Sequence, residues 1–197
     1  MKSALIIFVR NPELGKVKTR LAATAGDEQA LDIYCGLLNH TMLLATEIAA
    51  DKFVYYYQQI KADDIWNEDR FYKKIQTGEN LGDKMKAAFN EIFKLGYKRV
   101  IIIGSDCLQL NSTIINAGFA LLDEHDTVIG PATDGGYYLL GMKKSHGFLF
   151  DNKAWSTESV YDESIKDMQQ HHLSTGLLPV LTDVDTEADW IESKKLL

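Results

Sequence analysis

The stretch Val100-Ile-Ile-Ile-Gly-Ser-Asp106 places four consecutive β-branched residues directly before a glycine, a serine and a carboxylate. A continuous apolar run of this length is typical of a central parallel strand that helices cover on both faces. In sheets of that class, ligands bind in the crevice beyond the carboxyl ends of the strands. The stretch therefore predicts an α/β fold with a functional loop at Asp106.

Strand-like and helix-like patterns alternate on both sides of this stretch. Strands are predicted at residues 5–9, 53–57, 100–103, 127–129, 137–142 and 177–181. Helices are predicted from about residue 27 to 48, over 81–95, from 111 or 112 onward, and from 157 to about 168. Gly96 suits the C-terminal cap of the second helix, and Ser156 or Thr157 the N-terminal cap of the last. The alternation predicts a three-layer α/β/α sandwich with a mostly parallel sheet, and the length fits a single domain over residues 1–197.

Composition excludes several functional classes. The chain has 28 acidic and 21 basic residues and a formal net charge of -7, which argues against a nucleic-acid partner and suits a protein that holds a divalent cation. Its two cysteines, Cys35 and Cys107, have neither disulfide-scaffold nor zinc spacing, so a reducing cytoplasm is expected. The run Ala4 to Val9 is too short for a signal peptide, and no apolar stretch reaches the ~18 residues of a membrane span. Membrane insertion is therefore not expected.

Four cations and one acid fall within the eleven residues after the first predicted strand. The cations are Arg10, Lys16, Lys18 and Arg20, and the acid is Glu13. Lysine and arginine neutralise a diphosphate, and glycine and proline turns let backbone amides approach it. A solvated basic surface loop would give the same composition. The segment is not a Walker A loop, and the chain lacks the G-x-G-x-x-G pattern of a dehydrogenase.

Carboxylates follow three of the predicted strands. Asp106 follows one, Asp134 with Gly135 and Gly136 follows the next, and Asp183 and Asp185 follow the last. Magnesium takes one or two protein carboxylates together with phosphate oxygens and water, so Asp106 with Asp183 or Asp185 would suffice. Alternatively, Asp106 caps the helix that begins near residue 111, and the other two are turn residues.

Other reactive or aromatic residues support weaker hypotheses. Cys107 lies beside Asp106, but no histidine stands in a partner motif, so a small buried residue is the better interpretation than a thiol nucleophile. The adjacent histidines at 171 and 172 do not share a helical face, which favours solvated side chains over metal ligands. Trp155 could stack on a base or sugar, or seal the core.

Six motifs in a fixed order resemble a family of small bacterial glycosyltransferase-like proteins, DUF2064-type, with the GT-A (nucleotide-diphospho-sugar transferase) fold. More distantly, the chain is similar to nucleotidyltransferases that build molybdenum and deazaflavin cofactors. The motifs are Phe8-Val-Arg-Asn-Pro12 with Gly15-Lys-Val-Lys-Thr-Arg-Leu21, Leu81-Gly-Asp-Lys-Met85, Gly104-Ser-Asp-Cys107, Pro131-Ala-Thr-Asp-Gly-Gly-Tyr-Tyr-Leu-Leu-Gly141, Trp155-Ser-Thr157 and Asp183-Val-Asp-Thr186. The chain departs from the family pattern in having Arg10 for lysine, Leu108 for proline and Lys84 for arginine.

The resemblance implies a role for each candidate residue. It places Lys18 and Arg20 on phosphate, with Arg10 in the same loop, and a divalent Mg²⁺ or Mn²⁺ on Asp106 and Asp185, for which Asp183 is a possible substitute. By weaker analogy, Gln76 and Gly82 read the base. Asp134 and Trp155 would face the sugar or acceptor, with Gly135 and Gly136 also contacting substrate, and Asp134 is the candidate catalytic base.

The expected activity is metal-dependent glycosyl transfer from a nucleotide-diphospho-sugar to an acceptor that the sequence does not identify. A nucleotidyltransferase that releases pyrophosphate is the alternative enzyme. A non-catalytic nucleotide-binding protein of the same fold is a third possibility, because a fold does not determine a function.

Overall fold

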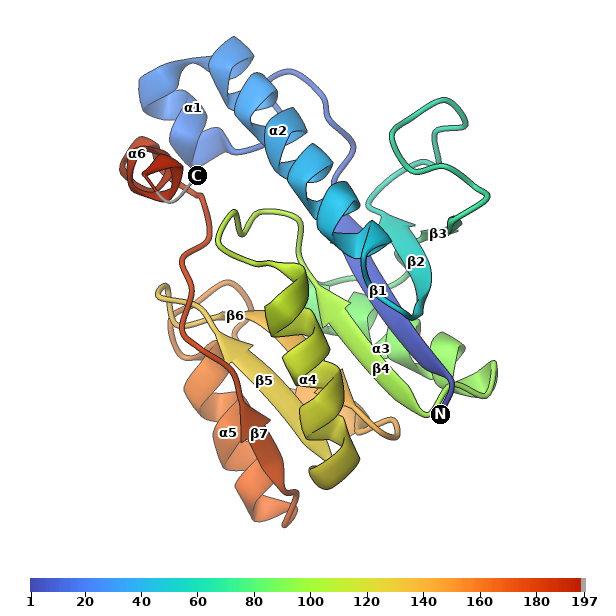
Figure 1. Cartoon of the computed structure of the whole chain (residues 1–197). Helices are drawn as coiled ribbons and strands as arrows, with labels where there is room; N and C mark the ends of the chain where they lie inside the picture. Colours follow the sequence, from blue (N-terminus) through green and yellow to red (C-terminus); the bar gives the residue numbers. More distant parts are fainter. Residues whose placement is uncertain (196–197) are drawn as a thin grey trace.

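A computed structural model describes residues 1–195 and contains a seven-stranded sheet with the strand order β3-β2-β1-β4-β6-β5-β7 (Figure 1). The strands are β1 (Ser3–Val9), β2 (Asp51–Tyr56), β3 (Phe71–Ile75), β4 (Arg99–Ile103), β5 (Thr127–Pro131), β6 (Tyr137–Met142) and β7 (Thr175–Leu177). Only β6 is antiparallel to its neighbours among these strands, pairing with β4 and β5. The predicted mostly parallel sheet is confirmed.

Helices cover both faces of the sheet. They are α1 (Thr19–Ala25), α2 (Asp27–Thr46), α3 (Leu81–Lys94), α4 (Ser112–Glu124), the short 3₁₀ helix η1 (Gly147–Phe150), α5 (Val160–Gln170) and α6 (Glu187–Lys194). Leu5 and Ile7 of β1 share one core cluster with residues of α2 and α4, whereas Ile6 belongs to a second cluster with residues of α3 and α5. This division follows from the period of two along a strand, and it produces the three predicted layers.

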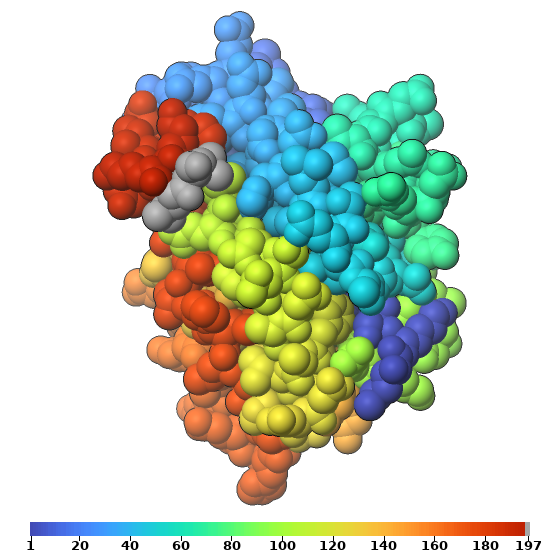
Figure 2. Space-filling model, in the orientation of Figure 1, coloured from blue at the N-terminus to red at the C-terminus, as the bar shows by residue number. Residues whose placement is uncertain are grey.

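The last helix returns to the N-terminal part of the chain. Trp190 of α6 packs on a cluster that includes Leu21 of α1, Leu37 of α2 and Val184. In Figure 2, the red C-terminal segment that includes α6 lies beside the blue segments of α1 and α2 on the surface. The segment before α6 is thereby brought beside the loop that precedes α1.

Several predicted boundaries are corrected. The last predicted helix, α5, begins at Val160 rather than 157, and no side chain caps it, because Ser156 has a φ of 68° and the hydroxyl of Thr157 bonds the carbonyl of Ala154. The predicted strand 177–181 overlaps β7 (Thr175–Leu177) only at Leu177 and otherwise makes an isolated bridge at Leu181. Pro179 lies between these two points and has no N–H to donate. The structure adds β3, α1, η1 and α6, which the sequence patterns missed.

The strand directions decide where the loops lie. The carboxyl ends of β1, β4, β5 and β7 all reach one edge of the sheet, and antiparallel β6 begins at that edge. The loops that carry Lys18, Asp106 and Asp134 therefore leave the sheet on the same side. Between residues 1 and 195, no helix combines the length and apolar character needed to cross a lipid bilayer.

Candidate functional site

The centre of the site is the ammonium group of Lys18. Lys18 precedes α1 and adopts a left-handed backbone (φ 47°, ψ 47°), and its side chain is only 7% exposed. Its Nζ lies 3.0 Å from Oδ2 of Asp106 and 3.0 Å from Oδ1 of Asp185. Burial lowers the pKa of Lys18, but the two carboxylates together outweigh burial and raise it. The lysine is therefore held as a cation between two acids that are distant in the sequence.

Hydrogen bonds from backbone amides fix the positions of Asp106 and Asp185 relative to each other. The amide of Val184 donates to the carbonyl of Asp106 at 2.9 Å, which ties the C-terminal segment to the loop after β4. The capping box of α6, formed by Thr186 and Asp189, also fixes this segment, because the Asp185 amide donates to Oδ2 of Asp189 at 3.1 Å. Arg20 completes the cluster by donating from its guanidinium to Oδ2 of Asp185.

Asp183 is a further carboxylate of this cluster. Its Oδ1 is buried and has no hydrogen-bond partner among the described residues. Burial raises the pKa of Asp183 to about 8, with further upward contributions from Asp106, Asp134 and Asp185 against the opposing charge of Lys18. With this pKa, Asp183 is mostly protonated at neutral pH, so a cation that bound to its carboxylate would have to displace the proton.

The donor set fits a hard divalent cation, but the side chains are not arranged around one. Carboxylate oxygens are the ligands of Mg²⁺ and Mn²⁺, and the unpartnered Oδ1 of Asp183 is a suitable donor. However, no three His, Cys, Asp or Glu residues within 1–195 are grouped as metal ligands. The ammonium of Lys18 bridges Asp106 and Asp185, the two predicted ligands. A metal at these carboxylates would replace the contacts that Lys18 makes with them.

The thiol of Cys107 lies at the edge of this cluster. Its Sγ is 3.7 Å from the carbonyl oxygen of Thr182, and the residue is buried. Burial raises the pKa of this thiol, and the charge of Asp183 raises it further. Because the thiolate is the nucleophilic form, these surroundings disfavour a nucleophilic Cys107.

The glycine loop between β5 and β6 packs on the start of α5. Gly135 has a φ of 84°, and a side chain there would overlap the main chain of Glu158. The amide of Gly136 donates to Oδ1 of Asp134 at 2.9 Å, and this bond orients the exposed Asp134 carboxylate. The backbone therefore requires a glycine at 135, whereas the amide bond at 136 could be made by any residue except proline, and a Cβ there would lie 3.1 Å from Oδ1 of Asp134.

Gly82 and Trp155 contact each other. The indole of Trp155 occupies the space that a side chain at position 82 would need, and its ring stacks on Phe150 with centroids 6.4 Å apart. The family resemblance implies that Gly82 contacts the base and that Trp155 faces the sugar or acceptor. In the structure, Gly82 of α3 contacts Trp155, which lies in the loop before α5. A ligand that bound at one of these residues would therefore lie near the other.

Arg10 and Gln76 lie at the ends of β1 to β3. The side-chain Nε2 of Gln76 donates to the carbonyls of Val9 (3.2 Å) and Tyr55 (2.9 Å). Its Oε1 takes no part in these two hydrogen bonds. The hydroxyl of Tyr34 accepts from the Arg10 amide at 2.8 Å and lies 3.5 Å from Oγ of Ser105. Tyr34 lies within the helix predicted from about residue 27 to 48, and the helical pattern carries no signal for this hydroxyl bridge.

Comparison with known proteins identifies the family to which the chain belongs. Residues 41–157 match the model of the family described as "Uncharacterized protein conserved in bacteria (DUF2064)". The chain belongs to this family. The resemblance drawn from the six sequence motifs is thereby confirmed. No curated protein matches the chain.

A crystal structure from Desulfovibrio desulfuricans, described as a candidate nucleotide-diphospho-sugar transferase, is similar to this DUF2064 protein. The two are 33% identical, with 94% of this chain and 84% of the other covered and a TM-score of 0.87. Two more distant structures share the fold. The inositol-1-phosphate CTP transferase of T. maritima is 13% identical (96% and 91% covered, TM-score 0.58). Rv0371C of Mycobacterium tuberculosis, solved with manganese, is also 13% identical (100% and 100% covered, TM-score 0.54).

Proposed function

We propose that this DUF2064 protein is a metal-dependent transferase that moves a glycosyl group from a nucleotide-diphospho-sugar to an acceptor. The observation that carries the proposal is the contact of Lys18 with both Asp106 and Asp185, at 3.0 Å each. A buried cation between carboxylates, with Arg20 beside it, can exchange partners when a diphosphate and a metal arrive together. The description of the D. desulfuricans relative supports the same substrate class.

Each residue of the cluster has a distinct role in this proposal. Lys18 and Arg20 bind the diphosphate of the donor, because lysine and arginine pair strongly with phosphate oxygens. Asp106 and Asp185 would hold Mg²⁺ or Mn²⁺. Asp183 interacts electrostatically with both of these carboxylates and could serve as a further ligand. When bound, the metal would offset the negative charge that develops on the leaving diphosphate. Asp134, held by the Gly136 amide, is the candidate base for the acceptor hydroxyl.

Nucleotidyl transfer is the second candidate. The T. maritima neighbour is named a CTP transferase, and it shares the whole fold with this chain. The same cluster of Lys18, Arg20 and carboxylates could bind a triphosphate and release pyrophosphate. The products separate the two activities, since glycosyl transfer releases a nucleoside diphosphate.

The test is a donor panel with and without divalent metal. Purified protein is supplied with nucleotide sugars, or with nucleoside triphosphates and sugar phosphates, and release of nucleoside diphosphate or pyrophosphate is measured with Mg²⁺, Mn²⁺ or a chelator. Asp106→Asn is expected to lower turnover at least about a hundredfold. Asp162→Asn, at an exposed position of α5, is the matched control and should retain turnover. Tight nucleotide binding with no turnover across the panel would favour a non-catalytic binding protein.

A further inference from the structure

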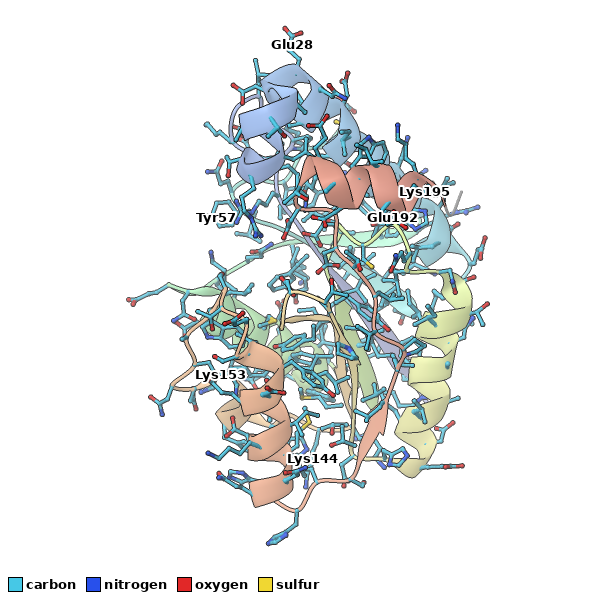
Figure 3. All side chains as sticks on the ribbon, turned by 90° about the vertical axis from the view of Figure 1, so that its left-hand side faces the viewer. Glu28, Tyr57, Lys144, Lys153, Glu192 and Lys195 are labelled. Atoms are coloured by element: carbon cyan, nitrogen blue, oxygen red, sulfur yellow. The ribbon has the colours of Figure 1, made fainter. Side chains whose placement is uncertain are left out.

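Two basic side chains lie over one exposed tyrosine ring at the same edge of the sheet. Nζ of Lys84 is 4.3 Å from the ring centroid of Tyr57, and Cζ of Arg10 is 5.5 Å from it. Tyr57 directly follows β2 and is 42% exposed, and its amide donates to the carbonyl of Val9 at 3.0 Å. Figure 3 shows Tyr57 well separated from Lys144, which lies near the opposite end of the molecule. We refer to Arg10, Lys84 and Tyr57 as the Tyr57 cluster.

The cations of the Tyr57 cluster are not neutralised by acids. The ion pairs found among residues 1–195 include neither Arg10 nor Lys84, so no described carboxylate lies within 4.0 Å of either cation. This is notable in a chain with a net charge of -7. The negative face of the tyrosine ring attracts each cation, but it does not cancel the charge of the pair. An anion is the missing complement.

A preformed hollow adjoins the Tyr57 cluster. Its lining residues are Arg10, Asn11, Glu13, Lys16, Tyr57 and Gln58. The buried side chain of Asn11 fixes one wall, because it accepts from the Gln58 amide at 3.1 Å and donates to the Gln59 carbonyl at 2.8 Å. Glu13 is the acidic lining residue, and Lys16 pairs with it at 2.7 Å. Arg10 and Tyr57 thus belong to both the hollow and the Tyr57 cluster, whereas Lys84 is not among the lining residues.

The Tyr57 cluster is connected to the Lys18 site without being part of it. The Tyr34 hydroxyl bonds the Arg10 amide and approaches Oγ of Ser105, the residue before Asp106. The side chains of Arg10 and Lys84 make none of the ion pairs that hold Lys18, Arg20, Asp106 and Asp185 together. Tyr34 thus links the backbone of the Tyr57 cluster to the loop that carries Asp106, while the ion pairs of the Lys18 site remain separate.

We propose that Arg10, Lys84 and Tyr57 form a subsite for a phosphate-class anion, in addition to the diphosphate held at Lys18 and Arg20. This inference rests on the proposed function, because it adds a second anionic group to the substrates of the same enzyme. Two sources supply such a group. It is either the third phosphate of a nucleoside triphosphate, which the nucleotidyl-transfer candidate would use, or an acidic group of the acceptor, which glycosyl transfer would use.

The test is a set of binding measurements by calorimetry on the wild type, Lys84→Gln, Tyr57→Leu and the control Lys144→Gln. Lys144 is an exposed cation away from the cluster, so its variant makes the same charge change elsewhere. The probes are inorganic phosphate, and nucleoside diphosphates and triphosphates with Mg²⁺. Phosphate affinity is expected to fall about tenfold in Lys84→Gln, and by less in Tyr57→Leu, while Lys144→Gln resembles the wild type. Thermal melting confirms that each variant is folded.

The binding of the different probes distinguishes a nucleotide phosphate from an acidic group of the acceptor. If Lys84→Gln weakens the triphosphate but not the diphosphate, the anion is the third phosphate of the nucleotide. If both nucleotides bind normally and phosphate binding to the diphosphate complex weakens, the anion belongs to the second substrate. Unchanged phosphate and triphosphate binding in Lys84→Gln, or an equal loss of diphosphate binding, overturns the subsite. Failure of every nucleotide to bind the wild type overturns the proposed function instead, and the phosphate arm still tests the cluster.

Discussion

At position 18, a lysine in a left-handed backbone conformation directs its ammonium between two carboxylates. Removing this charge leaves Asp106 and Asp185 close together with Arg20 as their remaining cation. Lys18→Met is therefore expected to lower the free energy of unfolding by about 1–3 kcal/mol, below the loss for a fully buried pair because Asp106 is 40% exposed. Urea denaturation measures the loss, and added Mg²⁺ should recover part of it. The control is Lys16→Met, which removes a surface ion pair with Glu13 and should cost less than about 1 kcal/mol.

Two helical glycines offer a matched comparison at the same scale. A side chain at Gly82 would overlap the indole of Trp155, whereas nothing lies within 4 Å of the corresponding position at Gly36. Gly82→Ala is expected to destabilise the protein by about 1–3 kcal/mol because the indole must move. Gly36→Ala should stabilise it by up to about 1 kcal/mol, since alanine favours the helix. Thermal denaturation measures both, and equal effects would contradict the packing described for Trp155.

At the scale of the element, α6 positions a residue of the site through its cap. The hydroxyl of Thr186 accepts from the Asp189 amide, and Asp189 bonds back to the amides of Asp185 and Thr186. Thr186→Ala is expected to cost about 1 kcal/mol and to weaken nucleotide binding as Asp185 loses its support. Calorimetry with a nucleoside diphosphate and Mg²⁺ measures the second effect. The control is Ser112→Ala, which changes the first residue of α4 but not its cap, Asn111; nucleotide binding weakened equally in both variants would argue against the coupling.

The start of η1 gives a pH prediction. His146 is buried there with its Nε2 unpartnered, and burial lowers its pKa, with the charge of Lys144 acting in the same direction. The unfolded state therefore binds the proton more readily. The contribution of His146 to stability is complete above a pH of about 6.5 and is lost as the pH falls toward the lowered pKa of the folded state. Urea midpoints measured between pH 7.5 and 5 should fall less in His146→Asn than in the wild type.

Predictability from sequence differed between elements for physical reasons. The buried run of β4 and the amphipathic pattern of α3 were clear because burial alone determines them. Edge strand β3 carries lysines at two of its five positions, and α1 is seven residues long, so neither has a strong periodic signal. The antiparallel direction of β6 could not be predicted either, because an apolar run of this kind is compatible with a parallel or an antiparallel strand.

At the scale of the whole molecule, the site joins segments that are 88 and 167 positions apart in the sequence. The sequence could place cations and carboxylates at one edge of the sheet, because parallel strands share an edge. It could not predict that Lys18 bridges Asp106 and Asp185, nor that Arg10 and Lys84 share the ring of Tyr57. Those contacts depend on side-chain directions that the fold as a whole decides.

Binding should also be linked across the molecule. Because Lys18 contacts both predicted metal ligands, Mg²⁺ alone has to displace it, whereas a diphosphate offers the lysine new partners. The affinity for a nucleoside diphosphate is therefore expected to rise when Mg²⁺ or Mn²⁺ is present, and the melting temperature should rise most when both are present. Differential scanning calorimetry tests this, and additive effects of the two ligands would contradict the linkage.

The return of α6 to the N-terminal helices has a consequence for protein synthesis. Strands β1 to β6 have all been translated before Asp185, which precedes α6 and is positioned when α6 docks on α1 and α2. A truncated product that stops before residue 185 would contain strands β1 to β7 without Asp185. Under the proposed function, premature termination would therefore yield a chain that lacks one of the residues proposed to hold the metal.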